Sequence, residues 1–405
     1  MPKPDLRILF LTAETCPTFR ADVNVLFGKY LPRHGILTDI VAGRTPGIIE
    51  NVQWGGGEAF LCDVEGGATK KHIKILWHSI WQLFRAERSR YKAFQVRDMP
   101  VLAAFGLLAA RIKGLPFYYW MSYPIPEGQI ELAMERGMAA GLMKFLFPLV
   151  SGQVGRFLLY RVVLRRADQV FVQSDRMKED MVARGVSPAR MTPVPMGVDL
   201  EDVRLENLPP VDDARLKGRR ILVYLGTLDR PRRIEILFEM LGRVRRQIPE
   251  ALLILVGDTA DDVHRAWLMQ QAQKAEVADA VLWTGWLPMK EGWRYVRAAE
   301  VALSPFPRGY LLDCSSPTKV PEYLALGVPV VCNDNPDQAK VIHESGAGLC
   351  VPYTPEEFAA AVLSILRKKH DDENQLLSSG FDYVKAQRSY ERISLMVAEV
   401  YKKLL

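Results

Sequence analysis

The sequence has 405 residues, 49% of them apolar and 25% charged, which is enough for two globular domains and excludes a disordered or collagen-like chain. Five scattered cysteines, without a CxxC pair or a His/Cys cluster at metal-ligand spacing, exclude a disulfide framework and argue against a structural zinc. The apolar run Leu6–Leu11 lacks a small-residue cleavage site, so it indicates a first strand and not a signal peptide. We therefore expect a cytoplasmic protein.

Short apolar runs alternate with amphipathic helices from the start of the chain. Arg7–Leu11 is typical of a buried strand, Val23–His34 has helical spacing, and Thr38–Val41 is typical of the next strand. Such alternation predicts parallel sheets covered by helices on both faces. In this fold class ligands bind at the carboxyl ends of the strands.

The alternation stops at residues 205–219, which are rich in Pro, Gly and charge and predict a linker. It resumes with a strand at Ile221–Leu225 and continues through the second half of the chain. We therefore predict two tandem α/β domains, residues 1–204 and residues 220–384. The last amphipathic stretch, residues 385–405, is expected to pack back on the first domain.

The whole chain has a formal net charge of +6. The positive charge is concentrated in residues 66–166, which contain 16 basic and 5 acidic side chains. The apolar run Met138–Val150 in this region is shorter than the ~20 residues that span a bilayer. Basic and aromatic side chains together favour an anionic membrane surface or an anionic substrate over nucleic acid. A domain core with a solvated basic face remains the alternative. The basic residues are Lys70, Lys71, Lys74, Arg85, Arg88, Arg90 and Lys92, around Trp77, Trp81 and Phe84.

A strand that ends in glycine and enters a basic loop is a candidate phosphate site. Gly226 lets the backbone turn tightly, and exposed amides before the next helix can accept an anion. Arg230, Arg232 and Arg233 add positive charge suited to phosphate oxygens. A solvated basic loop is the alternative.

The stretch Ser-Ser-Pro-Thr-Lys at 315–319 opens a predicted helix. Ser315, Ser316 and Thr318 can present amides and hydroxyls to an anion. Lys319 in the first turn opposes the helix dipole unless an anion binds there, and Glu322 on the same face can accept hydrogen bonds from a diol. A capped helix with an ordinary ion pair is the alternative.

The run Ser316–Val331 resembles the donor-binding helix of the retaining GT-B glycosyltransferases of family GT4. Three other segments match in order and spacing: Val170–Asp175 with Val194–Asp199, then Tyr224–Arg233, then Leu253–Asp258 with Leu282–Pro288. The resemblance implies a GT-B fold, that is, two Rossmann-like domains with a cleft between them.

The resemblance also implies roles for individual residues. Glu322 would bind the ribose hydroxyls, and Lys319 with Arg232 would neutralise the donor diphosphate as it leaves. No metal and no other cofactor is implied. The remaining donor-binding residues would be Gly226, Thr227, Arg230, Trp286, Leu287, Ser315, Ser316, Pro317 and Thr318.

This sequence departs from the family pattern at two places. Cys314, beside Asp313, stands where the family has the first of two glutamates, and Ser122 stands where many members have a catalytic histidine. Asp98 is interpreted either as the N-cap of a helix or as a catalytic carboxylate on the acceptor side. The candidate sugar or acceptor contacts are Ser122, Glu127, Asp313 and Cys314.

The implied reaction is transfer of a sugar from a nucleotide-sugar donor, with UDP favoured, to a hydroxyl of a polysaccharide or lipid-linked glycan precursor. The expected location is the cytoplasm, peripherally on the inner face of the cell membrane. Two alternatives remain: a nucleotide-sugar epimerase of the same architecture, and a non-catalytic scaffold in polysaccharide assembly.

Overall fold

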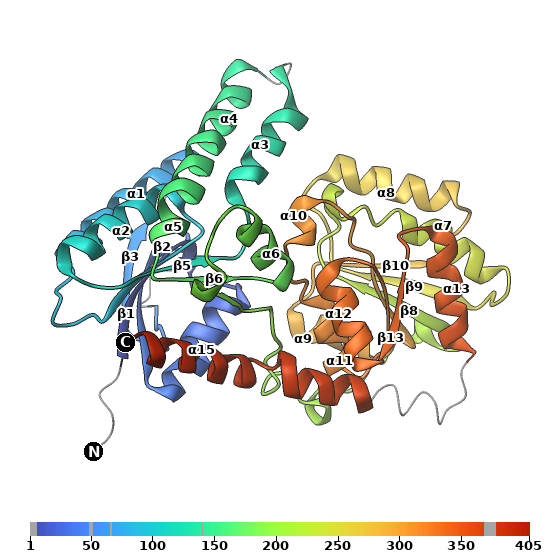
Figure 1. Ribbon diagram of the computed structural model, residues 1–405. Helices are drawn as coiled ribbons and strands as arrows, with labels where there is room; N and C mark the ends of the chain where they lie inside the picture. The colour runs from blue at the N-terminus through green and yellow to red at the C-terminus, as the bar shows by residue number, and fades with distance from the viewer. Residues whose placement is uncertain (1–5, 48–51, 65–66, 139–140, 368–377) are drawn as a thin grey trace. The chain divides into compact units, whose positions relative to one another are not determined.

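The computed structural model describes residues 6–47, 52–64, 67–138, 141–367 and 378–405 (Figure 1). The chain divides into two compact units. Unit 1 comprises Met1–Met196 with Tyr390–Leu405, and unit 2 comprises Gly197–Ser389. Residues 1–5, just before the predicted first strand, and residues 139–140, in the predicted apolar run, lie outside the described residues.

Unit 1 is built on a parallel sheet in the order β3-β2-β1-β4-β5-β6-β7. Side chains on both faces of β1 are buried, because helices cover the sheet on both sides and the strand therefore reads as a continuous apolar run. The strands are β1 (Leu6–Cys16), β2 (Ile36–Arg44), β3 (Ala59–Asp63), β4 (Ala93–Arg97), β5 (Phe117–Met121), β6 (Gln169–Val172) and β7 (Met191–Pro193).

The helices of unit 1 include a long antiparallel pair, α3 and α4, that extends from the sheet layer (Figure 1). The C-terminal helix α15 also belongs to this unit: its Tyr401 hydroxyl donates to Gln95 at 2.5 Å, and Ser394 bonds His34 at 3.0 Å. The described helices are η1 (Asp22–Tyr30), η2 (Leu31–His34), α1 (Ala68–Arg85), α2 (Pro100–Lys113), α3 (Ile125–Arg136), α4 (Leu142–Phe157), η4 (Leu158–Val163), α5 (Leu164–Arg166), α6 (Asp175–Ala183), η5 (Pro188–Arg190) and α15 (Tyr390–Leu404).

Helix α4 continues through η4 and α5 without a break, which makes one helix of 25 residues from Leu142 to Arg166. By length and composition alone this helix could cross a membrane, and 22% of its apolar window is buried in the protein. The part of the predicted apolar run from Leu142 to Val150 therefore belongs to a longer helix, because Leu159 and Val163 continue the apolar pattern beyond Arg156.

Unit 2 contains a second parallel sheet, in the order β10-β9-β8-β11-β12-β13. Alternate residues of β8 enter two different cores: Leu222 and Tyr224 pack with α7 and α13, whereas Ile221 and Val223 pack with α9 and α11. The strands are β8 (Arg220–Leu225), β9 (Ala251–Val256), β10 (Val281–Gly285), β11 (Val301–Ser304), β12 (Val330–Asn333) and β13 (Gly348–Val351).

Residues 205–219 lie within unit 2, where they form short 3-10 turns against α9. The amide of Val211 donates to the carbonyl of Arg294 at 3.0 Å, and the Arg297 side chain donates to the carbonyl of Leu208 at 3.2 Å. The described helices of unit 2 include α7 (Ile236–Arg245), α8 (Asp262–Lys274), α9 (Met289–Arg297), α10 (Tyr310–Asp313), α11 (Lys319–Ala325), α12 (Pro336–Ser345), α13 (Pro355–Leu366) and η10 (Val384–Arg388).

Candidate active site

In unit 2 the loop after β8 passes directly under the side chain of Lys319. Gly226 has a φ of +141°, and a Cβ there would lie 2.8 Å from Cε and 2.9 Å from Nζ of Lys319. Only glycine accommodates both this backbone conformation and so close an approach. The loop is held in place by the Tyr224 hydroxyl, which donates to the carbonyl of Thr227 at 3.1 Å.

Lys319 and Arg232 place two positive charges together at this edge of the sheet. The ammonium of Lys319 lies 5.1 Å from the ring centre of Tyr224, and the guanidinium of Arg232 lies 5.2 Å from that of Phe306. Burial and, to a smaller extent, the charge of Arg232 together lower the pKa of Lys319 to about 7, while Glu322 opposes the shift. A bound anion would favour the protonated, charged form of Lys319 and would offset the cost of burying that charge beside Arg232.

Glu322 is the carboxylate of this group, one turn after Lys319 on α11. Burial raises its pKa to about 7, against the opposing effects of Lys319 and of a hydrogen bond with Thr318. A half-buried carboxylate beside Lys319 can accept the hydrogen bonds of neighbouring hydroxyls on a ligand.

Arg230 is directed elsewhere. Its side chain is exposed and donates to Asp261 at 3.2 Å, and Asp261 in turn caps α8 by accepting the amide of His264 at 3.0 Å. The structure thus brings Lys319, Arg232, Glu322 and Gly226 together, whereas Arg230 connects the loop to α8.

The hydroxyls of Ser315 and Ser316 have partners within unit 2. Ser315 donates to the carbonyl of Leu312 at 2.6 Å, and Ser316 donates to Asp337 at 2.7 Å. Asp337 also forms a buried ion pair with Arg388 at 2.7 Å. In this conformation the buried carboxylate and the helix carbonyl accept these serine hydroxyls, and their role in binding an anion stays a prediction. Pro317, in the same segment, is buried.

Asp337 and Arg388 support the candidate site through Ser316, and the sequence analysis did not indicate them. They fix the loop that precedes Lys319, but 51 residues separate them and neither belongs to a motif. No spacing rule could have paired them.

Asp313 and Cys314 are less accessible than the resemblance implies. Asp313 accepts two hydrogen bonds from Arg308, at 2.8 and 3.0 Å, and Arg308 also binds Asp334 at 2.7 Å. Cys314 is completely buried. In this conformation Cys314 offers no atom to a sugar, because its thiol lies inside the fold.

The loop after β10 carries the two residues assigned to the nucleotide base. Gly285 has a φ of +70°, which turns the chain at the strand end. Trp286 then lies exposed, whereas Leu287 packs on the core beside α9. The loop therefore presents its backbone, with one exposed aromatic side chain beside it.

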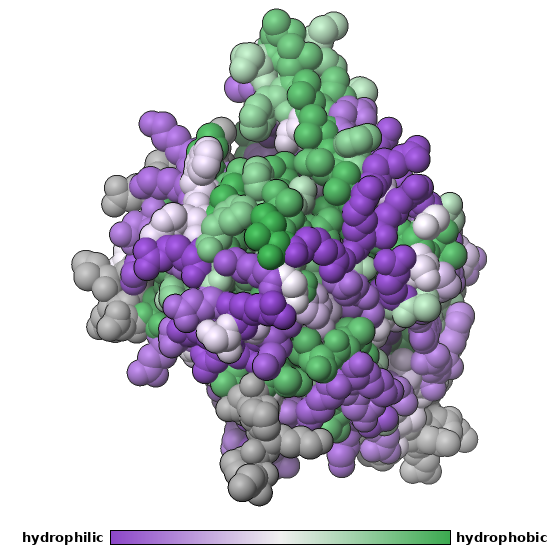
Figure 2. Space-filling view, turned by 60° about the vertical axis from the view of Figure 1, so that its left-hand side comes forward, coloured by the Kyte–Doolittle hydropathy of each residue, from purple (hydrophilic) through white to green (hydrophobic). Residues whose placement is uncertain are grey.

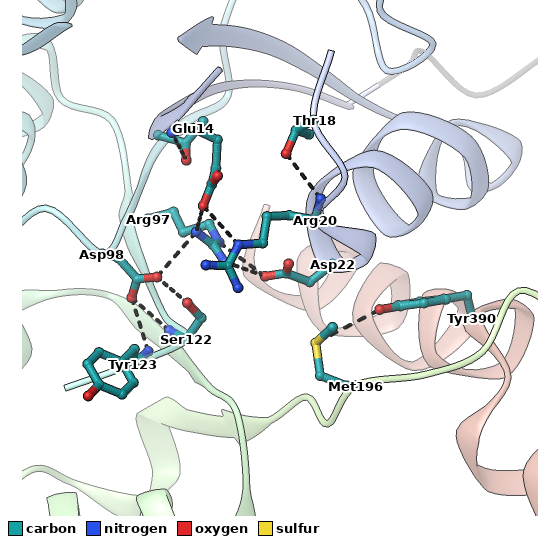
Figure 3. Close-up of polar contacts among 11 residues, drawn as sticks. Glu14, Thr18, Arg20, Asp22, Arg97, Asp98, Ser122, Tyr123, Met196 and Tyr390 are labelled. Atoms are coloured by element: carbon teal, nitrogen blue, oxygen red, sulfur yellow. Dashed lines mark hydrogen bonds and ion pairs between the residues drawn. The ribbon is translucent and has the colours of Figure 1, made fainter. Parts of the chain in front are cut away.

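In unit 1 a buried charge cluster lies where β1, β4 and β5 end (Figure 3). Arg97 binds Asp22 at 2.9 Å, Glu14 at 3.0 Å and Asp98 at 3.3 Å. Asp98 accepts the amide of Ser122 at 2.8 Å and also the Ser122 hydroxyl. The sequence analysis did not single out Glu14, Asp22 or Arg97. The carboxyl ends of adjacent parallel strands meet at one edge of a sheet, and this rule could have indicated Glu14 and Arg97.

Asp98 is not a helix N-cap. Met99 occupies that position before α2 and makes no side-chain cap, while Asp98, with a φ of +55°, instead binds the loop after β5. Burial raises the pKa of the Asp98 carboxyl, and Arg97 and Ser122 oppose that shift. The structure thus joins two of the predicted acceptor-side residues, Asp98 and Ser122, in one contact.

Glu127 lies apart from this pair, in the first turn of α3. It accepts the Tyr160 hydroxyl at 2.8 Å and lies 3.7 Å from Arg184. These contacts join α3 to η4 and to the end of α6. Among the described residues, no group of three or more His, Cys, Asp or Glu side chains could hold a metal ion.

Two parallel-sheet α/β units, with a basic loop against a Lys-Glu helix in the second, define a glycosyltransferase of the GT-B type. The chain belongs to the GT4 family of glycosyltransferases: residues 219–368 match the family model described as "Glycosyl transferases group 1", and residues 26–197 match the "Glycosyl transferase 4-like domain".

Known proteins similar to this chain are distant in sequence. Alpha-monoglucosyldiacylglycerol synthase of Streptococcus pneumoniae is 24% identical over 248 residues, which are 58% of this chain and 53% of the relative, so the chain matches about half the length of this curated relative. The structure of sucrose-phosphate synthase from Thermosynechococcus elongatus has a TM-score of 0.71 at 20% identity, covering 98% and 99% of the two chains. Anabaena HepE in complex with UDP and glucose has a TM-score of 0.68 at 14% identity, covering 98% and 100%. These structures establish the shared fold.

Proposed function

We propose that the protein is a retaining glycosyltransferase that takes a sugar from a UDP-sugar and transfers it to a hydroxyl of a lipid-linked glycan precursor or a polysaccharide. The observation that supports the proposal most is the position of Lys319 over Gly226, with Arg232 and Glu322 close to its ammonium. Two similar structures, of Anabaena HepE, contain UDP with glucose and UDP-glucose, which supports UDP as the nucleotide. Retention of configuration follows from the family resemblance.

The donor site would act on the charge of the departing diphosphate. Negative charge grows on the diphosphate as the glycosidic bond breaks, and Lys319 and Arg232 would stabilise it without a metal ion. Gly226 and Thr227 would lie against the phosphates. Glu322 would accept hydrogen bonds from the ribose hydroxyls, and the backbone at Trp286 and Leu287 would hold the base.

Unit 1 would supply the acceptor side. Asp98, buried and bonded to Ser122, is proposed as the carboxylate that orients the acceptor hydroxyl and receives its proton. A raised pKa suits this role, because a general base accepts a proton most effectively when its pKa is near the working pH. The proposed location is the cytoplasmic side of a membrane, where lipid-linked acceptors are found.

A thermal-shift series with UDP, GDP, UDP-sugars and GDP-sugars tests the nucleotide directly, because a ligand that binds the folded state raises its stability by mass action. We expect UDP and one UDP-sugar to raise the melting temperature, and GDP compounds to raise it less. Turnover of the stabilising donor to an epimer without acceptor would indicate an epimerase, and binding without any turnover would indicate a scaffold. Stabilisation by none of these compounds would contradict the proposal.

A further inference from the structure

Unit 1 exposes an unusually large apolar surface over neighbouring helices, which we call the apolar face. Figure 2 shows apolar side chains gathered on the α3–α4 hairpin at the top of the view and continuing below it. Scattered exposed apolar residues are ordinary, whereas a contiguous patch of this kind marks an interaction site. Its exposed members are Ile73, Trp77, Trp81 and Phe84 of α1, Val101, Phe105, Leu108 and Ile112 of α2, and Leu142, Met143, Leu146, Phe147, Val150, Val154 and Phe157 of α4.

The exposed residues of α4 form one continuous face. Their spacing over Leu142–Phe157 keeps them within one side of the helix, while Gly152 and Gly155 lie on the side that packs against α3. A Cβ at Gly152 would lie 2.7 Å from Ile130 and 2.8 Å from the carbonyl of Pro126, so the two helices approach closely. The hairpin is thus a fixed part of unit 1 that turns its apolar side outward.

The helix does not have the free length to span a bilayer. Leu159, Val163 and Leu164, at its C-terminal end, are buried in unit 1. The remaining exposed part is α4 itself, 16 residues, or ~24 Å at ~1.5 Å per residue, against a hydrocarbon core of ~30 Å. Glu131 and Glu135 on α3 are exposed as well, which also opposes full insertion.

Basic side chains accompany the apolar face. Lys70 and Lys74 are exposed on α1, Arg111 is exposed on α2, and Arg156 and Arg161 are exposed at the base of α4. The guanidinium of Arg85 lies 4.3 Å from the ring centre of Trp81. Cations and tryptophans beside an apolar surface are suited to the headgroup layer of an anionic membrane, which attracts the cations and accommodates amphipathic rings.

We propose that the apolar face inserts into one leaflet of an anionic lipid bilayer, with the α4 side chains among the acyl chains and the basic side chains at the headgroups. The inference deepens the proposed function, because it brings unit 1 to the surface where a lipid-linked acceptor lies. Insertion requires no donor, so the two ideas can fail separately. Since apolar burial contributes to the binding, part of it should persist at high salt, whereas purely electrostatic binding is screened.

Flotation of the full chain with vesicles tests the inference. Vesicles of phosphatidylcholine with phosphatidylglycerol should carry the protein at low salt and retain a substantial fraction at high salt. The double variant Met143→Asp, Phe147→Asp should reduce the bound fraction roughly tenfold or more at both salt concentrations, because two large apolar side chains no longer enter the bilayer. Lys70→Gln with Lys74→Gln should weaken binding at low salt only.

Val263→Asp is the matched control, because Val263 is 73% exposed on α8 and lies outside the apolar face. It should float like the wild type, and all variants should keep the wild-type melting temperature and the response to UDP. Absence of vesicle binding, or binding that salt removes completely and that the Met143→Asp, Phe147→Asp variant retains, would overturn the inference. So would a wild-type oligomer that ignores vesicles and becomes monomeric in that variant, because the apolar face would then join copies of the chain.

Discussion

Lys319 combines two unfavourable conditions, burial and a neighbouring cation, that one bound diphosphate would relieve together. A lysine with a pKa of about 7 is largely neutral in the free protein above neutral pH. If the proposed donor binds here, the arrangement would couple its binding to the protonation of Lys319. Glu322, with a raised pKa of about 7, is then already deprotonated and can accept hydrogen bonds.

We therefore predict that UDP-glucose binding at about pH 8 takes up a proton, up to about one per site. The bound diphosphate raises the pKa of Lys319, so the lysine takes up a proton on binding. The affinity for UDP-glucose should therefore fall as the pH rises above about 7, the pKa of Lys319 in the free protein. Titration calorimetry in buffers of different ionisation enthalpy measures the uptake. Lys319→Arg, charged at every pH, should bind without uptake; equal uptake by both proteins would refute the role of Lys319.

At the scale of elements, the site depends on how closely the loop after β8 approaches α11. Gly226 provides that approach, and the buried Asp337–Arg388 pair holds the loop before α11 from the other side. The two contacts fix the helix that carries Lys319 and Glu322. The geometry of the site is thus a property of the loop and the helix together.

Gly226→Ala should separate the role of this contact from ordinary backbone strain. The new Cβ would displace the Lys319 side chain, so we expect a loss of about tenfold or more in turnover. Gly218→Ala is the control, because Gly218 also has a positive φ, +73°, and its Cβ would meet nothing within 4 Å. Both variants should lose about 1–2 kcal/mol of unfolding free energy in urea denaturation. Equal turnover in the two variants would contradict a role for the Gly226 contact.

The fold was predictable because parallel sheets buried on both faces produce apolar strands alternating with amphipathic helices, as in Ile221–Leu225 and Ala251–Val256. The grouping of Lys319 with Glu322 follows from helical spacing alone. The contact of Gly226 with Lys319 does not, since it joins residues distant in sequence. The N-cap interpretation of Asp98 failed for the same reason: Asp98 binds Ser122, which lies 24 residues further along the chain in the loop after β5.

For the whole molecule, the structure combines a cation-rich anion site in unit 2, a buried carboxylate at the strand ends of unit 1 and an exposed apolar face on the helices of unit 1. Under the proposed function, each would serve a different part of a transfer reaction: the donor, the acceptor hydroxyl and the surface that presents the acceptor. Of these, the proposed donor site has the most specific chemistry, since Lys319 lies against Gly226 with Arg232 and Glu322 close to its ammonium.

The most direct test of the donor site is the initial rate of UDP release from the donor that stabilises the protein, compared between Lys319→Ala and Lys290→Ala. Both variants remove one lysine charge, but Lys290 is exposed on α9. We predict a fall of at least about a hundredfold for Lys319→Ala, equivalent to about 2–4 kcal/mol of barrier, with an unchanged fold and a normal rate for Lys290→Ala. A near-normal rate in the Lys319→Ala protein would contradict the assignment of this site.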